Sequence, residues 1–568
     1  MKTGFVGRGN QNHNWVCQVA SHLAQKSPSM NKFLTISFCA LMTVALAAKA
    51  APAPDLIARI HFVGADQISA DANSAAFTNF FCSAEAQALR EQALNKLSHF
   101  PYTWFKSCLA AGARDGAAQL RPLLDDLLKS EWFLEIRATT NGAPESALAI
   151  RLNSGRAELW SKNLAAVLQN WTGLGISQDR PGIWWLKKHE APNLFQFSRS
   201  GDWVVMDCGQ DNLSLGGGIL AMAAKPAIKE TNWLTADLDW PRLAQWFVPL
   251  GNFDFPKIDL QLIGRAGDVW ATGNFTLAQP LPPLEKWRMP TNVIHQPLAS
   301  FTAVRSIGPW LARQDWARRY EIQPTPNQFF IWALPQMPFQ TFAATPVPDA
   351  ATAVAQLDAK LPVAFNARSS DLFLPPITAV LTNNEISWRN VPFAAPFVQA
   401  WHEPAGDFLL GGFFPNTPRS QPLPPELFQQ LNTPNLVYYH WEATAERLDK
   451  LPQLTQLLLL ITQHKQLEAN SAAYKWLKRV GPTLGPTVTK VTQTGPNELS
   501  FLRKSPGGLT AVELIALANW LEAANFPGCD LRLPPPPPRP KRPLHNQPGA
   551  PAKPAPAAPA PGSPALPH

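Results

Sequence analysis

Ile258-Asp259-Leu260-Gln261-Leu262 alternates apolar and polar side chains, and Val269-Trp270-Ala271-Thr272 follows it after the turn-forming Gly267-Asp268. Alternation with a period of two predicts a β-strand with one buried face. Two such runs joined by a glycine turn predict a β-hairpin. The same pattern recurs upstream, where residues 132–137 and 147–152 flank Asn141-Gly142. The chain therefore predicts antiparallel sheets.

Helical patterns lie between these hairpins. Apolar residues recur at helical spacing from Ser83 to His99, just before Pro101. They recur in the same way from Ala157 to Asn170, just before Gly173, and both patterns predict helices. Thr510-Ala511-Val512-Glu513 predicts a helix start, because Thr510 can cap the amide of Glu513 while the glutamate reaches back. Helices beside hairpins predict an α+β fold in which helices pack on antiparallel sheets.

Matching segments recur about 205 residues apart and predict two related halves. Each half should then be an antiparallel sheet with helices packed on it, the first domain being residues 51–290 and the second residues 291–533. A body of this length is also too long for one compact core. The matched pairs are Gly201-Asp202-Trp203 with Gly406-Asp407-Phe408, Arg242-Leu243 with Arg447-Leu448, Asp237 with Glu442, and Trp184 with Trp388. Downstream, each half also offers a strand, a glycine turn and a strand, at Gly267 and at Gly495.

The amino-terminal region, residues 1–50, has the parts of a secretory signal. Met30-Asn31-Lys32 precedes an apolar stretch from Phe33 to Ala48, which ends at Ala48-Lys49-Ala50. The stretch is shorter than the ~20 residues that span a bilayer as a helix. We expect translation to begin at Met30 and cleavage between Ala50 and Ala51, with a retained membrane anchor as the alternative. The predicted location is the periplasm or cell envelope.

Residues 534–568 form a tail with 15 prolines. Such a composition predicts an extended, disordered segment. Residues 1–50 hold five Lys or Arg and the tail holds four, with no Asp or Glu in either, so 40 basic and 41 acidic residues remain between them. The net charge of +8 therefore does not indicate a nucleic-acid-binding body. Basic residues of the tail could contact an anionic wall or membrane surface.

Four cysteines follow the predicted cleavage site, namely Cys82, Cys108, Cys208 and Cys529. An oxidising compartment permits disulfides, and four cysteines allow three complete pairings. Cys82 and Cys108 are nearest in the chain and are the candidate pair, with only the first predicted helix between them. The alternative is that the cysteines are small buried apolar side chains.

Catalytic and metal motifs are weak. His189-Glu190 and His402-Glu403 lack the second histidine of a zinc helix and are followed by prolines, which predicts loops. His440 and Glu442 should share one face of a strand, where a structural histidine is expected. Glycines 216–218 predict a turn. We expect no catalytic residue, no metal and no cofactor.

The 21 tryptophans are an unusual enrichment. They favour core packing, and stacking on a ligand such as a sugar is the alternative. Segments of the last 130 residues resemble large uncharacterised exported proteins of planctomycete and verrucomicrobial bacteria. These segments are Asn435 to Trp441, Glu446-Arg447-Leu448, Val488-Thr489-Lys490-Val491, Pro496-Asn497-Glu498-Leu499 and Arg503-Lys504-Ser505-Pro506. The resemblance implies an envelope address and assigns no catalytic residue.

Three functions remain open at this point. The first is a non-enzymatic structural or interaction protein of the envelope, whose partner would be an envelope protein or a cell-wall glycan. The second is an envelope hydrolase whose active site is assembled from distant residues. The third is a glycan-binding protein that uses exposed tryptophans.

Overall fold

The computed structural model describes residues 55–139, 144–180, 182–187, 193–209, 215–223, 232–246, 255–313, 324–335, 340–357, 378–382, 384–390, 394–414, 425–450 and 471–528. The predicted signal segment with Ala50 and Ala51, the tail and Cys529 lie outside these residues. No helix in the described ranges is long and apolar enough to cross a membrane.

The described residues form an α+β fold with one sheet of twenty strands, in which every pair of neighbours is antiparallel. The strands are β1 (Leu56–Phe62), β2 (Trp132–Arg137), β3 (Glu145–Arg151), β4 (Ile176–Arg180), β5 (Ile183–Lys187), β6 (Asn193–Ser200), β7 (Trp203–Cys208), β8 (Leu234–Asp239), β9 (Lys257–Arg265), β10 (Asp268–Thr276), β11 (Ser300–Arg305), β12 (Gln328–Ala333), β13 (Thr341–Val347), β14 (Thr378–Thr382), β15 (Glu385–Arg389), β16 (Phe397–Glu403), β17 (Gly406–Gly412), β18 (Leu436–Ala443), β19 (Pro486–Gln493) and β20 (Glu498–Ser505).

Helices occupy the connections. They are α3 (Ala65–Ala70), α4 (Ala75–Phe81), α5 (Ala84–Phe105), α6 (Ala117–Lys129), α7 (Ser154–Thr172), α8 (Leu215–Ala223), α9 (Trp240–Trp246), α10 (Gly308–Ala312), α13 (Pro425–Leu431), α15 (Ala472–Val480) and α16 (Ala511–Glu522), with short 3-10 turns η2 (Ala72–Ser74), η3 (Lys106–Cys108) and η6 (Gly481–Thr483). Residues 350–357 and 444–450 are also helical.

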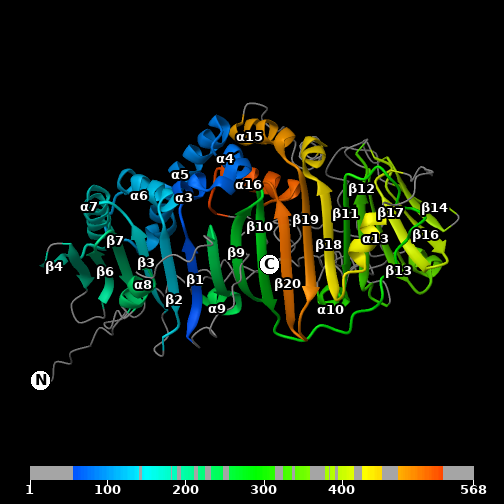
Figure 1. Ribbon diagram of the computed structural model, residues 1–568, viewed down its shortest axis with the longest axis horizontal. Helices are drawn as coiled ribbons and strands as arrows, with labels where there is room; N and C mark the ends of the chain where they lie inside the picture. Colours follow the sequence, from blue (N-terminus) through cyan, green and yellow to red (C-terminus); the bar gives the residue numbers. More distant parts are fainter. Residues whose placement is uncertain are drawn as a thin grey trace, which may run out of the picture.

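The strand order is the same on both sides of the sheet's centre (Figure 1). The first ten strands lie in the order β4-β5-β6-β7-β3-β2-β1-β8-β9-β10. The last ten lie in the order β14-β15-β16-β17-β13-β12-β11-β18-β19-β20. The two series meet where β10 pairs with β20.

The packing is continuous across the expected domain boundary at residues 290 and 291. One apolar cluster joins Phe80 and Leu89 of the first series to Trp476 and Leu514 of the second. Another joins Ala271 to Phe501 across the central pair of strands. The described parts of residues 51–290 and 291–533 therefore share one sheet and two apolar clusters.

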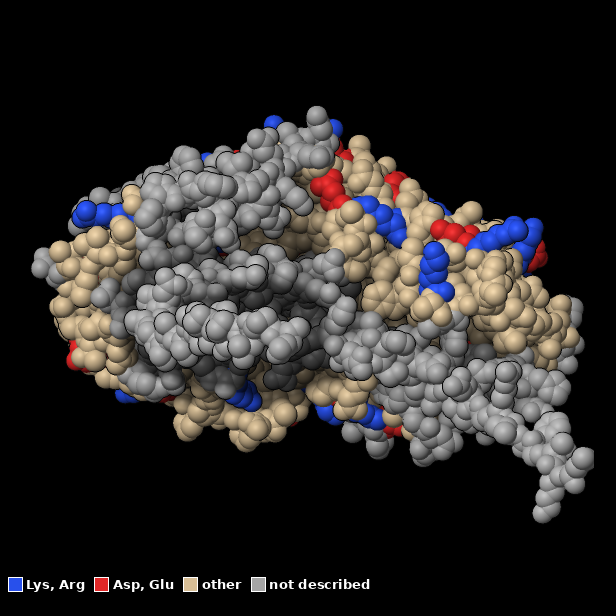
Figure 2. Space-filling view, turned by 180° about the vertical axis from the view of Figure 1, so that it is seen from behind, with Lys and Arg blue, Asp and Glu red and all other residues tan. Residues whose placement is uncertain are grey.

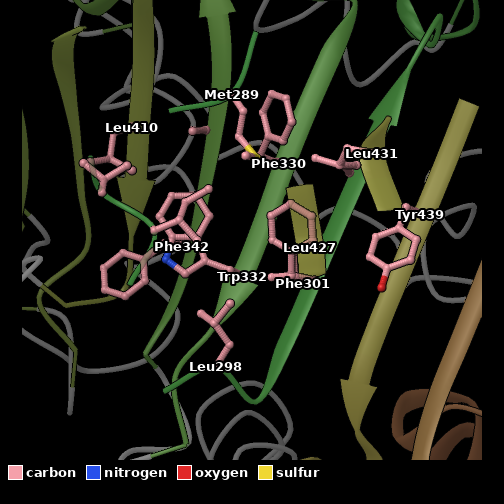
Figure 3. Packing of buried hydrophobic residues seen from close by; sticks show 14 of the residues in the cluster. Met289, Leu298, Phe301, Phe330, Trp332, Phe342, Leu410, Leu427, Leu431 and Tyr439 are labelled. Carbon is pink, nitrogen blue, oxygen red and sulfur yellow. The ribbon is translucent and has the colours of Figure 1, made fainter. Parts of the chain in front are cut away.

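The second series has a further core on the other face of the sheet (Figure 3). Phe301, Phe330 and Trp332 project from neighbouring strands, and Leu427 and Leu431 of α13 cover them. The segment that precedes β11 adds Met289, Val293, Ile294 and Leu298 to this cluster. The face is thus closed by a helix and by an irregular segment.

Several local predictions are confirmed and others are wrong. The capping box of Thr510 and Glu513 is present at the start of α16. The first helix, however, continues through Pro101 to Phe105, since a proline removes one amide bond but does not always end a packed helix. Glycines 216–218 lie in α8 rather than in a turn. The absence of a side chain at Gly216 lets this helix approach the carboxylate of Asp207.

The candidate disulfide between Cys82 and Cys108 does not fit this fold. The two cysteines lie at opposite ends of α5, whose 22 residues make a helix about 33 Å long. A disulfide needs Cα atoms within about 7 Å of each other. Cys82 and Cys208 are free cysteines in the described residues. Nearness in the sequence is misleading for this pair, because a straight helix keeps its two ends apart.

Candidate functional site

Successive side chains of the central strands alternate between the two faces of the sheet, as the sequence predicts. Half-buried polar side chains lie on one of these faces. In β9, Ile258 and Leu260 are buried on one face while Asp259 and Gln261 are half-buried on the other. Residues that are directly paired on neighbouring strands lie on the same face of the sheet. The partners of Asp259 and Gln261 on β8 and β10 therefore belong to this face as well. We call this surface the open face. It carries polar residues together with the apolar or aromatic Phe133, Ile263, Trp270 and Leu502, and we define it by Arg59, His61, Phe133, Glu135, Thr235, Asp237, Asp259, Gln261, Ile263, Trp270, Thr272, Asn274, Ser500, Leu502 and Lys504.

In Figure 1 no described helix lies in front of the middle of β1, β9, β10 and β20; α8 and α13 lie to either side, and α9 packs at the lower ends of β1 and β9. The corresponding strands of the second series carry Phe301, Phe330 and Trp332 on this side, covered as described above. On the same side of the sheet, β1 and β2, the strands equivalent to β11 and β12, carry Arg59 and Glu135, so the two series differ in polarity at these strands.

Charged groups on the open face pair with each other. Glu135 is buried and accepts from Arg59 Nε at 3.0 Å and from Arg137 Nε at 2.5 Å. Lys504 lies 3.2 Å from a carboxylate oxygen of Asp268. Asp237 and Asp259 are directly paired across β8 and β9, so two further carboxylates lie side by side on this face.

The uncharged groups of the open face have unused hydrogen-bonding capacity. Thr235, Gln261 and Thr272 follow one another across β8, β9 and β10. Asn274 pairs with Ser500 on the next strand. The side chains of these five residues make no hydrogen bond with other described residues. A ligand rich in hydrogen-bonding groups could therefore bind without breaking existing contacts.

The opposite side of the molecule carries both signs of charge. In Figure 2, Lys and Arg lie beside Asp and Glu along the rim formed by the helices of the first series. One example is Arg121 of α6, which pairs with both Glu91 and Asp125.

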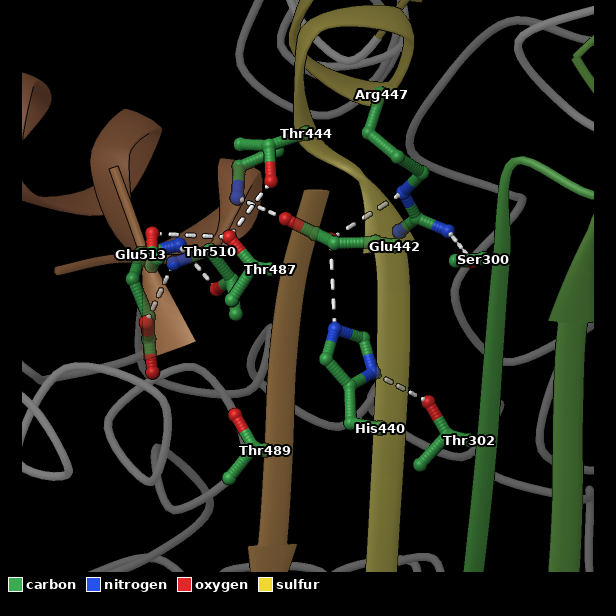
Figure 4. Close-up of polar contacts among 12 residues, drawn as sticks. Ser300, Thr302, His440, Glu442, Thr444, Arg447, Thr487, Thr489, Thr510 and Glu513 are labelled. Atoms are coloured by element: carbon green, nitrogen blue, oxygen red, sulfur yellow. Dashed lines mark hydrogen bonds and ion pairs between the residues drawn. The ribbon is translucent and has the colours of Figure 1, made fainter. Parts of the chain in front are cut away.

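A buried polar network lies under the start of α16 (Figure 4). His440 and Glu442 project from the same face of β18, as their alternation predicts, with His440 Nε2 3.5 Å from Glu442 Oε2. Thr302 Oγ1 lies 2.8 Å from His440 Nδ1, and Arg447 Nε lies 3.9 Å from Glu442 Oε2. The network joins β11, β18 and the helical segment 444–450, which are far apart in the sequence.

Glu442 is fully buried and holds the start of α16, since the amide of Ala511 donates to its Oε1 at 2.7 Å. Burial alone raises the pKa of the Glu442 carboxyl, but His440, Arg447 and the Ala511 amide together bring that pKa below its usual value. Arg447 Nε faces Glu442 Oε2 at 3.9 Å, and neither atom has a hydrogen-bond partner among the described residues. The pair is therefore held by charge attraction rather than by a hydrogen bond.

A second buried ion pair secures the same helix. Arg503 donates from Nη1 to Glu513 Oε2 at 2.8 Å and from Nη2 to Oε1 at 3.1 Å. Arg503 Nε also donates to Thr489 Oγ1 at 3.0 Å. Glu513 accepts from the amide of Thr510 at 2.8 Å as part of the capping box. This bidentate pair ties α16 to β19 and β20.

Asp207 is a buried carboxyl group of a different kind. It lies at the end of β7 beside the start of α8, and its Oδ1 has no hydrogen-bond partner among the described residues. Burial raises its pKa to about 7; nearby Glu145 also raises it, and the amide of Gly216 opposes the shift. No sequence motif marks this residue, because its burial depends on the packing of α8.

Other predicted candidates are dispersed. His402 and Glu403 lie in β16 rather than in a loop, where His402 Nδ1 is 2.8 Å from Asp407 Oδ1 and Glu403 accepts from the amide of Asn292. His189 and Glu190 lie outside the described residues. Within the described ranges, no group of three or more His, Cys, Asp or Glu is arranged to hold a metal ion.

Tryptophan serves mainly in the cores. Trp160 and Trp184 pack together in one cluster, and Trp332 and Trp476 are almost completely buried in others. Among the described tryptophans only Trp104 is exposed, at 39%. No row of exposed tryptophans is therefore present in the described part of the chain.

Comparison with protein-family models and with curated proteins finds no match. Among solved structures two chains match. One of them is crystal form I of TP0453, with a TM-score of 0.20 and 10% sequence identity, and the match covers 42% of this chain and 100% of that one. A TM-score of this size carries no argument about fold or function.

Proposed function

We propose that this protein is an exported component of the cell envelope that acts by binding a partner rather than by catalysis. The observation that carries the proposal is the open face, over the middle of which no described helix lies between α8 and α13. Its unused hydroxyl and amide groups suit a partner that contributes hydrogen bonds rather than charge. The predicted signal segment supports the envelope address.

The two alternatives have less support in the described residues. A hydrolase would require a reactive constellation in an accessible cleft, whereas His440 and Glu442 lie under α16 in a charge-balanced network. A glycan-binding surface built on tryptophan would require exposed rings, and among the described tryptophans only Trp104 is exposed.

We also propose that the two series of strands arose by internal duplication. The identical strand order supports this relation. Gly201 lies in the turn before β7 and Gly406 is the first residue of β17, and both have positive φ. Arg242 and Arg447 each follow the equivalent strand and reach the first residue of β1 or β11, donating to Leu56 O and Ser300 Oγ. A superposition of β1–β10 on β11–β20 that fails in an experimental structure would refute the relation.

The exported form should begin at Ala51. Cleavage after Ala50 follows from the small residues at positions 48 and 50. Amino-terminal sequencing of protein from the envelope fraction checks this expectation. A sequence beginning at Met30 would instead identify a retained anchor.

Binding through the open face should be lost when one arginine is placed there. The variant Thr272→Arg puts a long cation beside Gln261 and Leu502 and prevents close contact. We expect wild-type protein to stay with the envelope fraction through a high-salt wash and Thr272→Arg to be released several-fold more.

Two controls accompany this comparison. Thr272→Ser keeps the hydroxyl group, and Gln92→Arg adds the same charge on an exposed position of α5. Both should be retained like wild type. Equal retention of Thr272→Arg would exclude the open face as the contact surface. Loss of wild type in high salt would point to the basic tail instead, because contacts between exposed charges are screened by salt.

A further inference from the structure

The two strands at the ends of the sheet differ in how they are protected. Among the described residues, β4 pairs only with β5 and β14 pairs only with β15, so each leaves one edge without a partner strand. Free edges are usually blocked by charged residues, prolines or bulges. The sequence of β4 includes Asp179 and Arg180, and its register shifts between Gln178 and Arg180.

The equivalent edge strand of the second series has none of these devices. β14 reads Thr-Ala-Val-Leu-Thr, without charge, proline or glycine, and its pairing with β15 is regular throughout. Leu381 is 49% exposed at this edge. Its row continues inward through Ile386 and Val398, which are directly paired. The apolar layer of this end therefore reaches the last strand and remains partly exposed there.

The hairpin geometry identifies which backbone groups point outward. Thr382 pairs with Glu385 across a two-residue connection, and the closing pair of such a hairpin is hydrogen-bonded. Every second residue then bonds to β15, namely Thr378, Val380 and Thr382. The N–H and C=O groups of Ala379 and Leu381 consequently point to the free edge.

We propose that β14 pairs with β14 of a second copy of this chain, antiparallel and around a two-fold axis at Val380. In this register Ala379 of each copy lies opposite Leu381 of the other, so the outward backbone groups satisfy each other. Leu381 then packs over the small Ala379 and continues the apolar row of Ile386 and Val398. The strand is self-complementary, as an isologous dimer requires.

The protein already contains one junction of this type. β10 and β20 occupy equivalent places in the two series, and they join the series as an antiparallel pair. A pair of five-residue strands buries less surface than a permanent dimer needs. We therefore expect a weak dimer whose population depends on concentration.

The test uses opposite charges at the proposed axis. In the dimer, Val380 of one copy would lie opposite Val380 of the other. This pair is not hydrogen-bonded, and the Cα atoms of such a pair are only about 4.5 Å apart. Val380→Lys and Val380→Glu each place like charges in contact, which is destabilising. In sedimentation equilibrium of residues 51–568, wild type should approach twice the chain mass with rising concentration, each variant should remain at the chain mass, and their equimolar mixture should recover the doubled mass.

A backbone variant provides an independent measurement. Ala379→Pro removes an N–H that points to the free edge without removing a bond to β15, whereas Ala379→Ser keeps that N–H. The proline variant should lose the dimer and keep the circular dichroism spectrum and melting temperature of wild type, and the serine variant should dimerise. The proposal is overturned if wild type stays monomeric at its solubility limit. It is also overturned if Val380→Lys dimerises like wild type, or if β14 proves to bind an extended peptide of another protein in place of its own copy.

Discussion

Glu513→Gln should be among the most destabilising single substitutions in this protein. The carboxylate of Glu513 accepts both terminal nitrogens of Arg503, and the side chain of that arginine is only 7% exposed. Removing the negative charge leaves a buried cation without a partner. Breaking such a pair typically costs about 3–5 kcal/mol. Urea unfolding of residues 51–533, followed by circular dichroism, measures the loss.

Two comparison variants isolate the charge from other effects. Glu498→Gln changes an exposed residue of β20 and should alter the unfolding free energy by less than about 0.5 kcal/mol. The double variant Arg503→Met with Glu513→Leu replaces the pair by apolar side chains and should recover much of the loss. If the double variant is as unstable as Glu513→Gln, an unpaired Arg503 is not the cause.

Local elements were predictable where one short-range rule dominates. The hairpin of β9 and β10 follows from alternation around Gly267, and the start of α16 follows from the capping box of Thr510 and Glu513. The end of α5 was not predictable in this way. Pro101 indicated a stop, yet the helix continues because its packing against other helices, including α6 and α15, outweighs one lost amide bond.

The candidate surface depends on long-range order that no local pattern contains. Alternation shows that Gln261 and Thr272 are polar positions of neighbouring strands, but it does not reveal that β8 lies beside β1 or that β10 lies beside β20. The buried network is similar. His440 and Glu442 were expected on one face, whereas Thr302 reaches His440 only through the pairing of β11 with β18.

Asp207→Asn should stabilise the protein at neutral and alkaline pH. In the folded state burial raises the pKa of Asp207 to about 7, against an ordinary value of 3.8. Between these values the folded state binds a proton that the unfolded state has released. The contribution of Asp207 to stability therefore falls as the pH rises from about 4 to about 7, and the full penalty remains at higher pH.

The size of the effect follows from the shift in pKa. Each unit corresponds to about 1.4 kcal/mol, so we expect a gain on the order of 2–4 kcal/mol at pH 8 and little change near pH 4. The asparagine keeps the shape of the side chain and an oxygen that can accept from the amide of Gly216. Unfolding free energies from urea titrations at several pH values would show a flatter pH profile for the variant.

The matched control is Asp202→Asn, an exposed aspartate in the turn that precedes β7. As a surface substitution close to Asp207 in the chain, it should change the unfolding free energy by less than about 0.5 kcal/mol. A profile of Asp207→Asn that runs parallel to wild type would mean that the Asp207 carboxyl is ionised in the folded protein throughout this range. The unpaired Oδ1 would then have to be solvated after local opening of α8, which amide hydrogen exchange of that helix would detect.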